Sequence, residues 1–160
     1  MNPTRFWRIA PAAALSFSLF APPHVLAFSP QSARAAKDAQ PFVGTWTASH
    51  QDTPIIVLEL HLEKGKLLGG IRVCAFTINT EDTGKIVEIT DRTLSGSVTV
   101  HNLEIFGKSL SFDWKDPDGD ENHWKLELTG ANAGRLIWLG LPKDLKAEPI
   151  PVTRPAPTQP

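Results

Sequence analysis

The chain has very little cysteine and no tyrosine. With Cys74 as the single cysteine, an intrachain disulfide cannot form. The fold must therefore be held by its apolar core alone, which a chain of this size can supply. Cys74 stands among apolar neighbours in a stretch that alternates like a strand, so we predict a small buried side chain rather than a reactive thiol.

An excess of positive charge is also lacking. Residues 1–27 carry two of the 16 lysines and arginines and no acidic residue. The remaining residues therefore have 14 basic and 17 acidic side chains, a net charge of −3. Nucleic acids and anionic membrane surfaces attract basic patches, so neither is an expected partner.

Motifs for catalysis or metal binding are missing as well. The four histidines after residue 27 do not pair at i, i+2 or i, i+4, and no glycine-x-serine-x-glycine turn occurs. The loop Asp116 to Asp120 has the acidic spacing of a calcium loop, but Glu121 stands where that loop needs glycine. We expect no enzymatic activity, no catalytic residue, no metal site and no cofactor.

The chain also lacks an apolar run long enough to span a membrane, and its clearest apolar segment lies near the N-terminus. Arg5 and Arg8 precede an apolar segment, 9–21, that is shorter than the roughly 20 residues of a membrane span. Val25-Leu26-Ala27 then supplies small residues for cleavage, so 1–27 reads as a signal peptide. Cleavage near Ala35 and an uncleaved anchor are the alternatives. We expect export to the periplasm or the cell exterior, with no membrane span after cleavage.

What the chain does contain is a two-residue apolar rhythm from Phe42 onward. Such alternation is typical of strands with one face in a core and one in water. Short turns separate about eight of them, which predicts an all-β, antiparallel, up-and-down eight-stranded barrel, with a two-sheet β-sandwich as the alternative. The predicted strands are 42–49, 55–62, 67–77, 86–91, 94–101, 103–115 (broken at Gly107), 122–129 and 135–141.

Both flanks of the predicted barrel domain, residues 42–141, differ from it in composition. Residues 28–41 are small and polar without a period, so we predict a flexible lead-in and no helix. Residues 142–160 hold six prolines. Proline at that density favours polyproline II and opposes sheet pairing. We expect this Pro-rich tail to be a ligand segment, a spacer or disordered, with 142–152 packed along the barrel wall as a further option.

Gly44-x-Trp46 at the head of the first strand resembles the start of calycin-type barrels such as the lipocalins. In that family the glycine permits a tight entry, and the tryptophan closes one end of the barrel against an arginine near the last strand. The resemblance implies such an arginine here, and Arg135 is the candidate. The lipocalin threonine-aspartate-tyrosine turn and C-terminal helix are absent. The rhythm of Gly107 to Phe112 is also similar to small secreted bacterial β proteins.

A small barrel is either filled by its side chains or leaves one cavity for an apolar ligand. Our first hypothesis is an exported, monomeric binding module for an apolar small molecule or a protein partner. The alternative is a filled-barrel interaction or inhibitor protein of the cell envelope that acts through its loops or the Pro-rich tail. The residues expected to line a cavity are Trp46, Leu58, Leu60, Phe112, Trp114, Trp124 and Trp138.

Overall fold

The computed structural model describes residues 30–155. The predicted signal peptide, 1–27, and the last five residues of the chain lie outside the described residues. Within that range, no helix has the length and apolar character needed to cross a membrane. The elements are α1 (Pro30–Ala39), η1 (Gln40–Phe42), β1 (Gly44–His50), β2 (Thr53–Glu63), β3 (Lys66–Val73), β4 (Ala75–Ile78), β5 (Ile86–Asp91), β6 (Val98–Thr99), β7 (His101–Phe106), β8 (Ser109–Lys115), β9 (Glu121–Leu128), β10 (Ala133–Leu139) and β11 (Ile150–Thr153).

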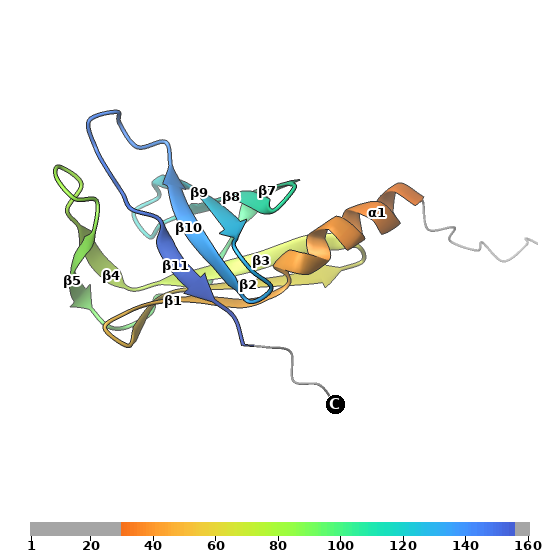
Figure 1. Cartoon of the computed structure of the whole chain (residues 1–160). Coiled ribbons are helices and arrows are strands. Elements are labelled where there is room, and N and C mark those ends of the chain that lie inside the picture. The colour runs from red at the N-terminus through yellow and green to blue at the C-terminus, as the bar shows by residue number, and fades with distance from the viewer. Residues whose placement is uncertain (1–29, 156–160) are drawn as a thin grey trace, which may run out of the picture.

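Nine antiparallel strands form one sheet in the order β6-β3-β2-β1-β11-β10-β9-β8-β7. The two edges of this sheet are joined by the chain itself, because β6 and β7 are separated only by Val100. The backbone N–H of Val100 donates to the carbonyl of Gly69 on β3, whereas His101 already pairs with Asp113 on β8. The sheet therefore curls into a nearly closed barrel, with α1 at one end and a separate β4–β5 ribbon at the other (Figure 1).

The prediction of an all-β, antiparallel, up-and-down barrel is confirmed, with nine strands in the barrel sheet rather than eight. The predicted strand 67–77 is divided at Cys74, where the chain leaves the barrel and continues into the β4–β5 ribbon. The backbone N–H of Cys74 donates to Ile55 on β2, which is the last such bond to the barrel before the ribbon begins. The predicted strand 94–101 is reduced to β6 and the start of β7.

The segment 28–41 differs from the expected lead-in, because Pro30–Ala39 is helix α1. Proline at the first helical position is pre-set for a helix, and alanine has the highest helix propensity. Alanine contributes little to an apolar period, and for this reason the sequence shows no helical stripe. Ala39 is buried at the end of the helix, where α1 approaches β3.

The Pro-rich tail also differs from expectation, because Ile150–Thr153 is strand β11 between β1 and β10. Ile150 and Val152 point into the core, and Pro151 between them faces outward. Four residue pairs join β11 to β10, but only Thr47 and Thr153 join it to β1. Apolar burial at alternate positions thus outweighs the missing N–H of one proline, and the first and last strands of the barrel meet.

Arg154 closes the end of the barrel at which β1 begins. Its guanidinium carbon lies 4.6 Å from the centroid of the Trp46 ring, and its N–H groups donate to the carbonyls of Val43 and Ala131. Gly44 has φ +132°, and a Cβ there would lie 3.2 Å from Cδ of Arg154. The sequence-based choice of Arg135 is therefore wrong: Arg135 forms an ion pair with Glu127 on the outer face of the sheet.

We predict that Arg154→Ala lowers the free energy of unfolding by about 2–4 kcal/mol, because it removes a cation–π contact and leaves backbone carbonyls without a charged donor. Arg135→Ala is the matched control. It removes a half-exposed ion pair and should cost below about 1 kcal/mol. Urea denaturation followed by circular dichroism measures both, and equal costs would contradict the closing function of Arg154.

Candidate functional site

The interior of the barrel is filled by its own side chains. Trp46, Leu58, Leu60 and Phe112, four of the predicted cavity-lining residues, are almost completely buried in one continuous apolar cluster. The other three, Trp114, Trp124 and Trp138, lie together at the end of the barrel that faces the β4–β5 ribbon. Trp114 and Trp124 belong to the same buried cluster and Trp138 packs against it, so the predicted set forms one core that reaches a barrel mouth at these three tryptophans.

These three tryptophans occupy neighbouring strands β8, β9 and β10. Trp124 and Trp138 are directly opposite each other in the register of β9 and β10. Their rings are stacked, with centroids 5.8 Å apart and planes inclined by 5°. Trp114 is paired with Asn122 in the adjacent register of β8 and β9. Inward positions on three paired strands thus build one aromatic wall.

The opposite wall is the segment 73–78, which leaves β3 and enters the ribbon. Together the two walls enclose an open pocket of about 440 Å³, which we call the tryptophan pocket. A second lobe of about 410 Å³ adjoins it, shares Val73, Cys74, Ala75 and Trp114, and extends toward Leu94. Volumes of this size suit small-molecule ligands.

Two buried indole N–H groups in this wall have no hydrogen-bond partner within the described part of the chain, namely Nε1 of Trp114 and Nε1 of Trp124. Their side chains are only 7% and 5% exposed. Buried donors are nearly always paired, and an unpaired one costs about 1–3 kcal/mol. The Trp46 indole, by contrast, donates to the Phe42 carbonyl at 2.8 Å. The pocket wall thus holds two donors that the protein leaves unused.

The β4–β5 ribbon is held in place by the chain that follows β10. Lys146 N–H donates to the Thr80 carbonyl and Glu148 N–H donates to the Gly84 carbonyl, both at 2.7 Å. The Lys146 ammonium adds a bond of 3.0 Å to the carbonyl of Asp82. In the sheet pairing itself, β4 and β5 pair only with each other. The segment 146–148 is therefore the strut that fixes the outer wall of the tryptophan pocket.

Cys74 lies in both lobes but is only 3% exposed. Burial raises the pKa of its thiol. A protonated, buried thiol is a poor nucleophile. Cys74 is therefore suited to forming part of an apolar wall and not to attacking a substrate.

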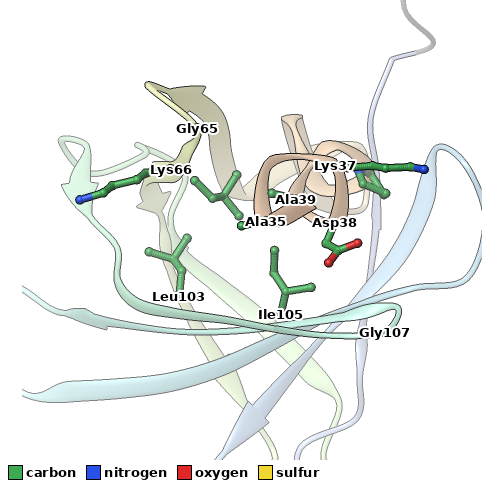
Figure 2. Close-up of a pocket in the computed structure, with 11 residues that line it drawn as sticks. Ala35, Lys37, Asp38, Ala39, Gly65, Lys66, Leu103, Ile105 and Gly107 are labelled. Atoms are coloured by element: carbon green, nitrogen blue, oxygen red, sulfur yellow. The ribbon is translucent and has the colours of Figure 1, made fainter. Parts of the chain in front are cut away.

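A larger cavity of about 780 Å³ lies at the opposite end, between α1 and the hairpin of β7 and β8. Figure 2 shows Leu103 and Ile105 pointing from β7 toward the helix, while Lys37 and Lys66 extend outward on opposite sides. The lining combines three branched side chains, Leu67, Leu103 and Ile105, with alanine, glycine and proline positions and with charged residues at its rim. It has no aromatic ring among its residues, so it lacks the stacking surface of the tryptophan pocket.

The acidic loop after β8 is stabilised by its own first residue. Oδ1 of Asp116 accepts hydrogen bonds from the backbone N–H groups of Asp118 and Asp120, at 3.1 and 2.9 Å. Oδ2 of Asp116 lies 3.4 Å from the side-chain amide of Asn122. These contacts give the spacing of aspartates a turn-forming function, as short polar side chains have in many loops.

Because two of the three buried indoles are unpaired within residues 30–155, we predict that replacing each tryptophan by phenylalanine changes the free energy of unfolding by different amounts. Trp46→Phe should lower the free energy of unfolding by about 1–3 kcal/mol more than Trp114→Phe or Trp124→Phe, because only the first substitution leaves a buried carbonyl without its donor. Each substitution removes the same atoms from a buried site and retains an aromatic ring. Urea denaturation followed by circular dichroism would contradict the assignment if the three costs were equal.

In comparisons with known proteins, no family model, no curated protein and no solved structure matched this chain significantly. The nearly closed antiparallel sheet is compatible with a small barrel.

Proposed function

We propose that this protein is an exported binding module that takes a flat, apolar small molecule into the tryptophan pocket. The observation that carries the proposal is the aromatic wall of Trp114, Trp124 and Trp138, with its two unused indole donors. Ligand sites are typically apolar concave surfaces with a few polar groups that fix orientation. The site lies at the mouth of the barrel, because the interior is already filled.

The wall also limits the chemistry of the ligand. Stacked indoles present flat apolar faces, so a planar ring or polyene gains more contact there than a branched chain does. The unused N–H groups favour a ligand that carries a hydrogen-bond acceptor such as a carbonyl, hydroxyl or ether oxygen. Both nitrogens lie beneath the pocket surface, so an acceptor must displace the side chains that cover them in order to accept their hydrogen bonds.

Two features support the remaining parts of the proposal. The leader 1–27 has the charge, length and cleavage residues of a signal peptide, which supports export to the periplasm or the exterior. Gly44, Trp46 and Arg154 at the closed end have the arrangement that the calycin resemblance implies, and this supports a relation to ligand-binding barrels. We infer that the protein acts as a monomer without catalysis.

The filled core favours one second candidate, an interaction or inhibitor protein of the cell envelope. Phe106 at the tip of the β7–β8 hairpin is 89% exposed and offers an apolar contact for a protein partner. The part of the Pro-rich tail that is engaged in the fold, 146–154, is less suited to this purpose. The two candidates differ in whether a small apolar molecule binds at all.

Retinol, a planar polyene with one hydroxyl group, is a suitable probe. We expect it to quench intrinsic tryptophan fluorescence saturably with the purified protein. Trp138→Ala should weaken binding about tenfold, because it removes half of the stacked pair. Phe106→Ala, at the other end of the barrel, is the matched control and should leave the affinity unchanged.

The outcomes separate the alternatives. Binding that is lost in Ile105→Ser but retained in Trp138→Ala would move the site to the cavity under α1. Absence of quenching by retinol and by oleic acid would refute small-molecule binding and favour the interaction protein.

A further inference from the structure

Outside the pocket, the strands β7, β8 and β9 bring together a histidine and two carboxylates that are far apart in sequence. Asp113 is opposite His101 in one register and opposite His123 in the next, and Glu121 begins β9 beside them. One donor atom from each of His101, Asp113 and Glu121 lies within 4.8 Å of the others. His101 and Asp113 are half-buried and Glu121 is exposed, so the cluster is open to solvent.

We propose that His101, Asp113 and Glu121 bind a divalent transition-metal ion of the zinc class on the outer face of the barrel. An imidazole and two carboxylates are a donor set that suits Zn²⁺ and its neighbours, whereas calcium and magnesium prefer oxygen donors alone. Three protein ligands leave at least one coordination position for water. This proposal is independent of the tryptophan pocket, since the cluster lies on the opposite face of the same strands.

Asp113 is held in place as the ligands of metal sites usually are. The side-chain amide of Asn102 donates to its Oδ2 at 2.8 Å, and Nδ1 of His123 lies 2.8 Å from its Oδ1. Such outer contacts orient a ligating carboxylate before the metal arrives. Partial burial raises the pKa of Asp113, but the hydrogen bonds from Asn102 and His123 and the nearby histidines outweigh this and hold it below its usual value.

The pair His101 and Glu121 occupies the other side of the cluster. Nε2 of His101 lies 2.5 Å from Oε1 of Glu121, which is a hydrogen-bond contact. Two ligands of a tetrahedral zinc ion are about 3.3 Å apart, so this pair must separate slightly and give up the proton between them. Lys115, whose Nζ lies 3.7 Å from Oε2 of Glu121, is the nearby cation that competes with the metal.

A β-bulge creates this cluster. Continuing the regular register from Glu104 and Ser111 would place Asn102 opposite Asp113. The register shifts between His101 and Glu104, and Asn102 takes a positive φ of 51°, which places His101 at that position instead. Bulges often redirect a side chain at functional sites. The shift explains why histidine spacing along the sequence did not indicate a metal site.

Isothermal titration of the purified protein with zinc chloride should show one saturable site. Asp113→Asn and His101→Ala should each weaken Zn²⁺ binding more than about tenfold, and His123→Ala and Asn102→Ala about tenfold through the lost orientation of Asp113. His61→Ala, an exposed histidine on β2, is the matched control and should bind as the unaltered protein does. Circular dichroism verifies that each variant is folded.

Further readouts test the donor set directly. Co²⁺ in this site should give visible absorption bands that Asp113→Asn and His101→Ala remove, and Lys115→Ala should strengthen Zn²⁺ binding because a competing ammonium group is gone. The absence of a one-to-one Zn²⁺ isotherm, unchanged affinity in His101→Ala, or calcium binding as strong as zinc binding would each overturn the proposal.

Discussion

The contact between Arg154 and Trp46 is the constraint on which the barrel depends. Trp46 belongs to the first strand and Arg154 follows the last, so their stacking holds together two segments more than a hundred residues apart. Without it, β11 would be joined to β1 by one residue pair only. The guanidinium also satisfies carbonyls before β1 and in the turn before β10, so one side chain fixes three segments.

Strands β8 and β9 carry the tryptophan pocket on their inner face and the proposed metal site on their outer face. Trp114 and Trp124 face inward to the tryptophan pocket, while their neighbours Asp113 and His123 face outward to the proposed metal site. Successive side chains of a strand alternate between faces, so a single residue step changes the environment from apolar to aqueous.

Sequence patterns predicted the barrel because the two-residue rhythm is local. The alternation of Leu110, Phe112 and Trp114 requires only that one face be buried, and the structure buries it. The sequence patterns failed in two segments whose composition did not indicate the element that forms there. Alanine-rich 30–39 forms a helix without an apolar stripe, and Ile150 and Val152 make a strand in spite of the prolines around them. Arg135 was the candidate because the last predicted strand was 135–141, whereas Arg154, which reaches Trp46, follows a strand that the prolines concealed.

The sequence by itself determined the inward side chains of strands with clear alternation, such as β8 and β9, because periodicity is a property of neighbouring residues. It did not do so for β2, where Ile55 and Val57 are buried as well as Ile56 and Leu58. It also placed Trp114, Trp124 and Trp138 on inward positions. Tertiary structure alone decided that these three meet at one end of the filled core. It alone decided that a bulge brings His101 to Asp113. The physical reason is that register and closure depend on contacts between distant strands, which the local pattern does not encode.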